Sequence, residues 1–327
     1  MVCQSHRKNT VTQLLRFRKI AYLCSKFGCL LMMFYRRKLI LALLKELGGE
    51  LNSTQFQKYL FLTTRKQENK SFDFVPYYYG CFSFQANQDI LTMAKQGMIS
   101  ECNSKIILID KTDYLQELTL FDQIIVRDIK EQFGGMSCNE LIRYTYVHYP
   151  FYAIKSKIAK EVLTPEELAR VEKQKRHFSD SRLFTIGYEG KSLERYLDFL
   201  IINDVKVLCD VRKNAYSQKY GFSKNQLQNA CKGIGIKYVH IPELGIESDM
   251  RRELSTQADY DELFDYYEKY TLPKNWEYLL KVRNLIEQDG RIALTCFEQN
   301  PKQCHRTRVA KALMGLNSIN YTFEEIL

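Results

Sequence analysis

Apolar positions repeat with a helical period early in the chain. Between residues 36 and 47 they recur every three or four positions, which is typical of the buried face of an α-helix. Gly48 ends this helix, because glycine favours the conformation that follows a last helical turn. Asn52 can cap a second helix that runs to Leu62, and a third amphipathic stretch covers residues 87–95.

An aromatic run over residues 72–79 and a turn at Gly80 separate the second and third of these helices. Helix, helix, hairpin-like turn and helix is the order of elements in a winged helix. We therefore predict a mainly α, winged-helix-like domain over residues 33–160.

Two strong helix starts follow. Ser137 with Glu140, and Thr164 with Glu167, each have the spacing of a capping box. The second helix runs into residues 173–177, which include no apolar residue, and the polar stretch lasts to Ser181. We interpret residues 161–181 as a polar helical linker.

From Leu183 onward the pattern changes to short apolar runs that alternate with amphipathic stretches. This alternation favours a parallel sheet covered by helices. We predict an α/β domain over residues 182–327. Its strands are expected at 184–187, 205–209, 236–239 and 292–295, and its helices at 193–202, 223–232, 259–270, 276–287 and 304–314.

The amino-acid composition indicates in which cellular compartment the protein occurs. The chain has 327 residues, of which 45% are hydrophobic and 26% charged, as in ordinary globular proteins. Its ten cysteines have no repeated spacing, which indicates reduced thiols and not a disulfide framework. We therefore expect a cytoplasmic protein.

The net charge of +10 depends on the first 32 residues, which carry six Lys or Arg and no acidic residue. An apolar stretch at 20–35 is interrupted by Lys26 and is shorter than a membrane span. We expect translation to start at Met32 or Met33; the alternative is a disordered basic arm, and a membrane anchor is least favoured. Net charge alone is then no argument for nucleic-acid binding.

Polar, titratable residues follow each predicted strand of the α/β domain. In a parallel α/β sheet the ligand binds outside the carboxyl ends of the strands, which meet at one edge. A purely structural sheet has no need of such residues side by side, so the pattern indicates a functional pocket. The residues that follow the four strands are Tyr188, Glu189 and Gly190; Asp210, Val211 and Arg212; His240; and Cys296, Phe297 and Glu298 with Cys304, His305 and Arg306.

Three short motifs occur in the N-terminal part: Tyr79-Gly80-Cys81-Phe82-Ser83, Asp89-Ile90 and Gly97-Met98-Ile99. Through them, roughly residues 33–155 resemble the Panacea (SocA-like) antitoxin family. The resemblance implies an interaction module without a catalytic role, which would bind a protein partner. It would also fit a defence or toxin–antitoxin setting. The alternative is a small helical domain whose aromatic residues only form a core.

The C-terminal part resembles the uncharacterised bacterial family called domain of unknown function 488, over about residues 182–315. Five motifs occur in the family's order, and only the loop at Ile246-Glu247-Ser248 departs from a common pattern. The resemblance implies the α/β fold and a site, but no reaction. The motifs are Thr185-Ile186-Gly187-Tyr188-Glu189-Gly190; Asp210-Val211-Arg212; Ser217; Tyr238-Val239-His240 with Pro242 and Leu244-Gly245; and Cys296-Phe297-Glu298 with Cys304-His305-Arg306.

Carboxylate chemistry is our preferred hypothesis for this site. Asp210 and Glu298, with Glu189 as a third carboxylate, could act as acid and base in hydrolysis. Arg212 and Arg306 would bind a substrate phosphate. Tyr188, Ser217 and His240 are further candidates for substrate binding. The alternative is that Asp210 and Arg212 form a salt bridge that only braces the loops.

Thiol and metal chemistry are the competing hypotheses. Cys304, at the start of a helix, could be a nucleophile with His305 or His240 as its base, or simply a half-buried cysteine. Cys296, Cys304 and His305, with His240, have the donor atoms that suit zinc. The seven residues between the two cysteines are unlike a short zinc knuckle, so we predict no cofactor and keep zinc as the weaker alternative.

We therefore expect a hydrolase that acts on a nucleotide or nucleic acid. The first alternative is a non-catalytic sensor in which the same pocket binds a nucleotide-like ligand. The second is a thiol-dependent enzyme that uses Cys304. No membrane partner is expected.

Overall fold

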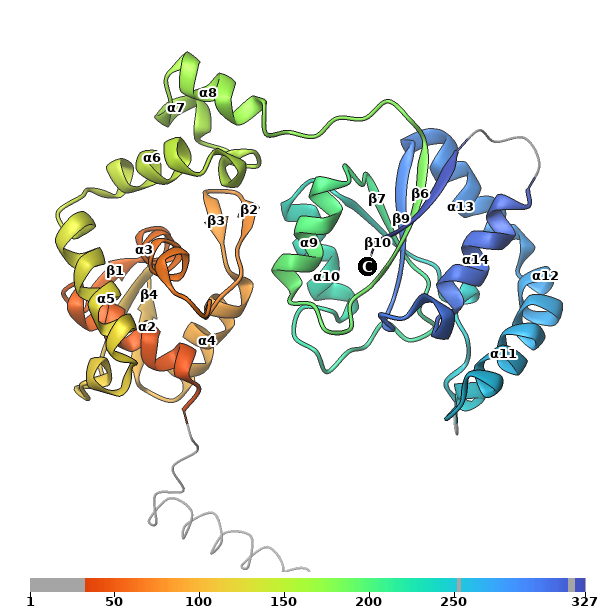
Figure 1. Cartoon of the computed structure of the whole chain (residues 1–327), viewed down its shortest axis with the longest axis horizontal. Helices are drawn as coiled ribbons and strands as arrows, with labels where there is room; N and C mark the ends of the chain where they lie inside the picture. The colour runs from red at the N-terminus through yellow and green to blue at the C-terminus, as the bar shows by residue number, and fades with distance from the viewer. Residues whose placement is uncertain (1–32, 252–253, 317–320, 327) are drawn as a thin grey trace, which may run out of the picture.

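The computed structural model describes residues 33–251, 254–316 and 321–326. The basic leader discussed above lies outside the described residues. An N-terminal helical part and a C-terminal α/β part lie side by side, and an extended segment after α8 connects them (Figure 1). None of the helices in the described part of the chain is both long and apolar enough to cross a membrane.

The N-terminal part has the winged-helix order that the apolar pattern predicts. A three-stranded antiparallel sheet, in the order β1-β5-β4, completes it. Its elements are α2 (Tyr35–Glu46), β1 (Glu50–Asn52), α3 (Ser53–Lys66), β2 (Val75–Tyr77), β3 (Gly80–Phe82), α4 (Phe84–Lys95), β4 (Ile99–Cys102) and β5 (Lys105–Leu108), followed by α5 (Leu120–Phe133), α6 (Cys138–His148), α7 (Ala159–Val162) and α8 (Pro165–Glu172).

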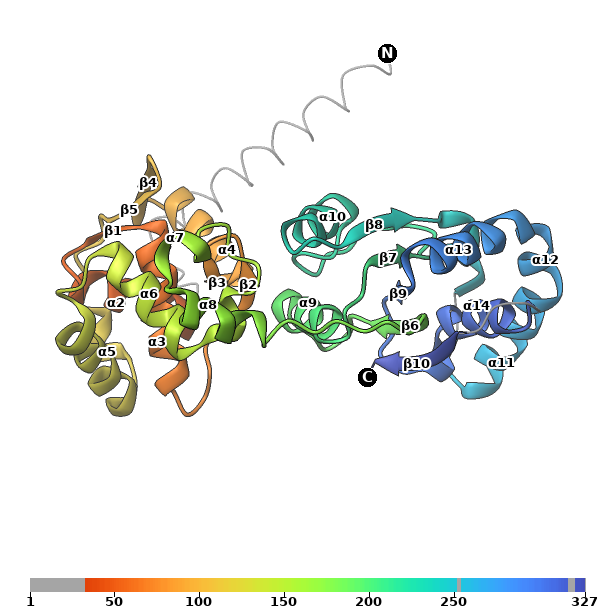
Figure 2. The ribbon, with the colours of Figure 1, turned by 90° about the horizontal axis from the view of Figure 1, so that it is seen from above.

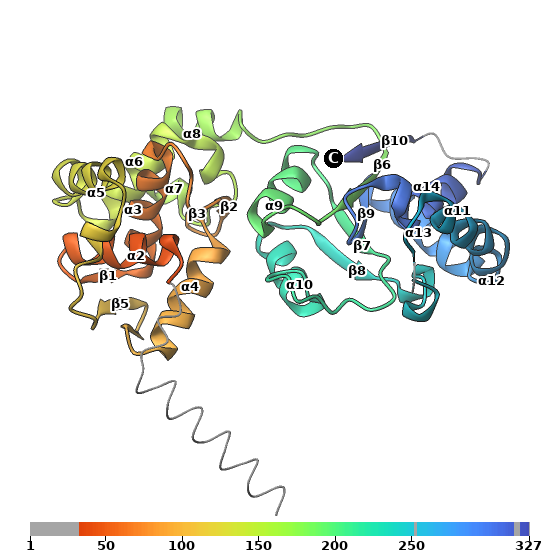
Figure 3. The ribbon, with the colours of Figure 1, turned by 60° about the horizontal axis from the view of Figure 1, so that its bottom comes forward.

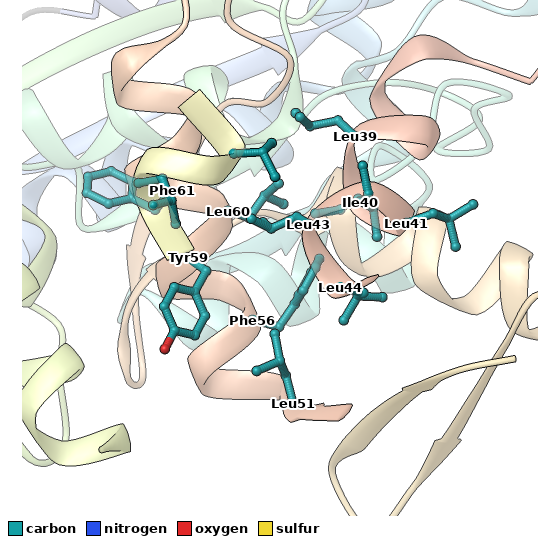
Figure 4. Packing of buried hydrophobic residues seen from close by; sticks show 14 of the residues in the cluster. Leu39, Ile40, Leu41, Leu43, Leu44, Leu51, Phe56, Tyr59, Leu60 and Phe61 are labelled. Carbon is teal, nitrogen blue, oxygen red and sulfur yellow. The ribbon is translucent and has the colours of Figure 1, made fainter. Parts of the chain in front are cut away.

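The helical core forms where the apolar faces of α2 and α3 meet. Leu39, Leu43 and Phe56 are fully buried there, together with Leu60, as Figure 4 shows. Asn52 begins α3 as predicted, since its side chain accepts a hydrogen bond from the backbone N–H of Gln55. Helix α5 was missed by the sequence analysis, although its apolar residues have helical spacing.

The C-terminal part contains the predicted parallel sheet, with one strand more than expected. All neighbours in the order β10-β6-β9-β7-β8 are parallel. The elements are β6 (Arg182–Gly187), α9 (Leu193–Ile202), β7 (Val207–Asp210), α10 (Lys224–Gly233), β8 (Lys237–His240), α11 (Gln257–Tyr266), α12 (Leu272–Lys274), α13 (Trp276–Asp289), β9 (Arg291–Cys296), α14 (His305–Met314) and β10 (Thr322–Ile326).

Helices cover both faces of this sheet (Figure 2). Successive side chains of β7 point to opposite faces: Leu208 packs with the cluster under α9 and α10, whereas Val207 and Cys209 pack with the cluster under α13 and α14. This double burial explains why the strands read as continuous apolar runs.

The two parts are in direct contact. Glu194 at the start of α9 accepts hydrogen bonds from the Ser83 hydroxyl at 3.1 Å and from the backbone N–H of Gln85 at 2.9 Å. Gly233 at the end of α10 lies against the ring of Tyr77, where a Cβ would come within 2.0 Å of a ring carbon. The contact between α4 and α9 is visible in Figure 3.

Candidate functional site

The predicted strand ends do meet at one edge of the sheet. Gly187 of β6 is in register with Cys296 of β9, and Asp210 of β7 is in register with Thr295 of β9 and His240 of β8. The loops after these strands surround a pocket of about 310 Å³. This volume is at the lower end of the range for small-molecule sites, roughly 300–1,000 Å³.

The pocket contains three of the predicted substrate-binding residues and both a thiol and an imidazole from the metal candidates. Its lining residues are Tyr188, Arg212, Lys213, Asn214, Tyr216, Ser217, Gln218, Ile246, Ser248, Arg251, Cys296, Phe297 and His305. The rings of Tyr216 and Phe297 are 72% and 43% exposed, so they form an open aromatic rim.

The end of β9 carries a compact cluster of reactive groups. The thiol of Cys296 lies 3.0 Å from Oε2 of Glu298 and 3.7 Å from Nδ1 of His305. One donor atom each of Cys296, Cys304 and His305 lie within 4.8 Å of one another, and all three residues are buried. The sequence analysis named these residues and took Cys304 as the candidate nucleophile, whereas Cys296 lines the pocket and Cys304 does not.

The tautomer of His305 follows from its neighbours. Nε2 lies 2.8 Å from the carbonyl oxygen of Val211, so this nitrogen carries the proton and donates it. Nδ1 is then an acceptor, and it receives a hydrogen bond from Nη2 of Arg251 at 2.7 Å. The lone pair of Nδ1 therefore faces the thiol of Cys296 and the guanidinium of Arg251.

The two thiols share their protons unequally. Burial raises the pKa of Cys296, but the hydrogen bond from Cys304 and the neighbouring His305 and Arg251 outweigh it and hold this pKa well below the ordinary thiol value. Burial and the negative charge of Cys296 raise the pKa of Cys304 well above that value. Both sulfurs lie next to the N-terminus of α14, where the helix dipole favours negative charge. Both shifts favour a thiolate at Cys296 over one at Cys304.

Arg251 links the thiol cluster to a carboxylate. It forms an ion pair with Glu298 on one side and the hydrogen bond to His305 on the other. Burial raises the pKa of Glu298, the charge of Cys296 raises it further, and Arg251 counteracts both in part. Arg251 was missed by the sequence analysis, because it lies in a short 3₁₀ helix (Ser248–Arg251) of a long loop and follows no strand.

The end of β7 holds a closed polar network. The carboxylate of Asp210 is fully buried and accepts hydrogen bonds from Nε of Arg212 at 2.8 Å, from its Nη2 at 2.5 Å and from the hydroxyl of Tyr238 at 2.6 Å. Nη1 of Arg212 donates to the hydroxyl of Tyr188 and to the carbonyl of Phe222. Burial lowers the pKa of Arg212, but Asp210 more than compensates and the net shift is upward.

These bonds leave Asp210 without a free oxygen for proton transfer, so its surroundings favour the bracing alternative over the predicted acid/base role. Its partner Arg212 lines the pocket wall, but its guanidinium N–H groups donate hydrogen bonds to oxygen atoms of the protein. Tyr188 is fixed by this network and by stacking on Phe222, with ring centroids 4.3 Å apart and planes 9° apart.

Arg306, predicted to bind phosphate, points elsewhere. Its side chain is only 1% exposed and donates to the backbone carbonyls of Glu298 and Gln299. It shares the buried face of α14 with Val309 and Leu313. The pocket lining does not include it, so Arg306 braces the loop after β9 and does not reach a ligand in the pocket.

Two further predicted residues also lie outside the pocket. The carboxylate of Glu189 accepts the backbone N–H of Gln299 at 2.9 Å and so holds the same loop. Nε2 of His240 faces the carbonyl oxygen of Arg212, 2.9 Å away, and His240 lines a separate shallow hollow beside Tyr216. Since a carbonyl only accepts, Nε2 of His240 is the donor. His240 and His305 thus face different hollows.

The fold and the site define a parallel α/β domain with a small polar pocket at the carboxyl edge of its sheet. Within it, residues 192–313 match the family described as "Domain of unknown function DUF488". This agrees with the resemblance predicted for the C-terminal part, while the resemblance of the N-terminal part to Panacea antitoxins stays a prediction. Comparison with curated proteins gives no match.

Proposed function

We propose that the protein is a hydrolase that acts on a small nucleotide-like substrate, with Glu298 as the general acid/base. The observation that carries the proposal is the cluster at the end of β9. There the thiol of Cys296 lies within hydrogen-bonding reach of both the carboxylate of Glu298 and the imidazole of His305. Cys296 and His305 line the strand-edge pocket, and Glu298 lies directly behind Cys296. Functional pockets of parallel α/β proteins occur at this edge.

The lining of the pocket supports a substrate with an aromatic base and an anionic group. The exposed rings of Tyr216 and Phe297 offer stacking surfaces for a base. The side chains of Lys213 and Arg251 are 39% and 28% exposed, so a phosphate can compete for them with Glu247 and Glu298, their acidic partners. The pocket volume favours a mononucleotide over a polymer.

The reaction needs one proton acceptor that becomes a donor. Water attacks the electrophilic centre of the substrate and gives a proton to Glu298, the bond to the leaving group breaks, and the leaving group takes that proton from Glu298. Arg251 holds the carboxylate in place through their ion pair. The closed network of Asp210 and Arg212 shapes the wall and takes no part in the proton transfer.

A second candidate is covalent catalysis by a thiol, now with Cys296 as the nucleophile in place of Cys304. It is favoured by the position of Cys296 at the pocket and by the hydrogen bond from Cys304, which stabilises its thiolate. The variant Cys296→Ser distinguishes the two candidates. If Cys296 is the nucleophile, the variant loses all activity, and the covalent acyl- or nucleotidyl-enzyme that mass spectrometry detects in the wild type is absent from the variant.

The test is turnover of a panel of nucleoside phosphates and nucleosides by the full chain, followed by chromatography of the products. We expect Glu298→Gln to lower kcat by about 10²–10⁴-fold, the usual contribution of a general acid/base, with ligand affinity retained. Glu262→Gln is the matched control, since Glu262 is an exposed glutamate on α11. Ligand binding without turnover in the wild type would contradict the proposal and favour the sensor.

A further inference from the structure

The cluster at the end of β9 has a second property that its hydrolytic role does not require. Two sulfurs and an imidazole nitrogen converge from two segments, the end of β9 and the start of α14, and all three side chains are buried. Buried thiols of an ordinary core are usually surrounded by apolar atoms. Here they face a carboxylate, an imidazole and a guanidinium instead.

We propose that Cys296, Cys304 and Nδ1 of His305 form a zinc site. Zinc binds thiolate sulfur at about 2.3 Å and imidazole nitrogen at about 2.0–2.1 Å in a tetrahedron, which places such a sulfur and nitrogen roughly 3.6 Å apart. The sulfur of Cys296 and Nδ1 of His305 are 3.7 Å apart. This donor set selects zinc over magnesium, calcium or manganese, which prefer oxygen ligands.

The orientation of His305 supports the site independently of this distance. A histidine that binds a metal usually donates its other ring N–H to a backbone carbonyl or a carboxylate. His305 does this with the carbonyl of Val211, at 2.8 Å. The bond fixes the tautomer in which Nδ1, the nitrogen on the side of the thiols, has a lone pair that accepts from Arg251 here and could bind a metal in its place.

Arg251 shows that this position attracts a cation. Its guanidinium donates to Nδ1 of His305 and forms an ion pair with Glu298, so a positive group already occupies this side of the cluster. Zinc would replace the hydrogen bond from Arg251 to Nδ1, and Arg251 would keep its ion pair with Glu298.

The inferred site has three protein ligands and therefore resembles a catalytic zinc centre, in which the fourth position holds water. Cys296 and His305 line the pocket, so this position can be reached by a substrate. The catalytic role rests on the proposed hydrolase: a zinc-bound water is a stronger acid than free water, and Glu298 next to Cys296 is placed to take its proton. Zinc binding itself does not depend on the reaction.

The test is the zinc content of the full chain, purified under reducing conditions, stripped with a chelator and reconstituted with zinc alone. We expect one zinc per chain. Cys296→Ser, Cys304→Ser and His305→Gln should each weaken binding by more than the roughly 10–100-fold that loss of an outer-shell partner causes. Cys102→Ser is the matched control, because Cys102 is an exposed thiol on β4.

Cobalt(II) gives a readout that does not depend on the stability of the variants. The wild type reconstituted with cobalt should show the thiolate charge-transfer absorption of two sulfur ligands. Zinc-free wild type after reconstitution, or equal zinc binding by the three ligand variants and the wild type, would overturn the proposal.

Activity separates this inference from the proposed function. If zinc binds as described but no nucleotide is hydrolysed, the hydrolase is refuted and the metal site stands. If hydrolysis survives complete removal of the metal, the metal site is refuted as the source of the nucleophile and the hydrolase stands.

Discussion

The ends of β7 and β9 lie next to each other in one sheet, yet they use the same kinds of polar residue in opposite ways. At the end of β7, Asp210 and Arg212 satisfy each other, and tyrosine hydroxyls take up the remaining bonds. At the end of β9, Arg251 contacts both Glu298 and His305, the thiol of Cys296 lies beside them, and the cluster faces a pocket.

The difference teaches that a buried charged residue at a strand end is not by itself a catalytic candidate. A fully paired carboxylate has no lone pair to offer a substrate, whereas a cluster with more anionic groups than cations can bind a proton, a metal or a ligand. We therefore expect substitutions at the end of β7 to lower stability and substitutions at the end of β9 to lower activity.

The largest effect is expected from Asp210→Ala. Removing this carboxylate leaves the guanidinium of Arg212 buried without its counter-charge, which typically costs about 3–5 kcal/mol of folding free energy. Urea unfolding of the full chain measures it. Asp265→Ala, an exposed aspartate on α11, should stay within about 0.5 kcal/mol. Near-normal stability of Asp210→Ala with lost activity would show that the β7 end is catalytic after all.

Gly187→Ala should damage the β9 end specifically. A Cβ at Gly187 would lie 1.9 Å from the carbonyl oxygen of Glu298, so the loop after β9 must move. We expect a loss of about 1–3 kcal/mol, as for other overpacked sites, together with lost hydrolysis and weakened zinc binding. Gly135→Ala is the control, because a Cβ there meets nothing within 4 Å. Unchanged activity in Gly187→Ala would show that the reaction does not depend on the position of Glu298.

Much of the fold could be predicted, because doubly buried strands and capped helices leave strong local patterns. Strand β10 was missed, since it lies at the edge of the sheet and mixes Phe323 and Ile326 with Glu324 and Glu325. Such an edge strand gains its stability from pairing with β6, which a local pattern does not record.

The location of the site could also be predicted, but the pairing of its residues could not. Strand ends identify Asp210, Cys296 and Glu298, because topology alone brings them to one edge. Which carboxylate finds a cation depends on Arg251, whose loop position no periodicity fixes. The burial of Arg306 could have been inferred from the helical spacing, since it lies on the same face of α14 as Val309 and Leu313.

Asp198 on α9 is a third buried carboxyl group, and its charged neighbours are acidic. Its Oδ1 is buried and has no hydrogen-bond partner among the described residues. Burial, and then the negative charges of Asp73 and Glu194, raise its pKa to about 8. Because the pKa is raised in the folded state, its contribution to stability is fully present at pH values below the ordinary carboxyl pKa and is lost as the pH rises through about 8.

Asp198→Asn removes this titration and keeps the shape of the side chain. As the pH rises from 6 to 9, the stability of the variant relative to the wild type should increase by on the order of 1–2 kcal/mol. One pKa unit corresponds to 1.36 kcal/mol, and water that enters the contact between the two parts would reduce the full effect. Thermal unfolding at both pH values measures the gain, and Asp265→Asn serves as the control. Equal gains at both values would mean that Asp198 is already ionised at pH 6.

The smallest effect concerns the two thiols of the β9 cluster. Cys296 lines the pocket, whereas Cys304 is fully buried beside it, so a small alkylating reagent reaches Cys296 from the pocket and reaches Cys304 only after local opening. In the metal-free protein we expect Cys296 to react roughly tenfold faster or more, with peptide mass spectrometry as the readout. Bound zinc should slow the reaction at both thiols, but not at the exposed Cys102. Faster labelling of Cys304 would reverse the assignment of the pocket-facing thiol, and with it the contrast between a closed β7 end and an open β9 end.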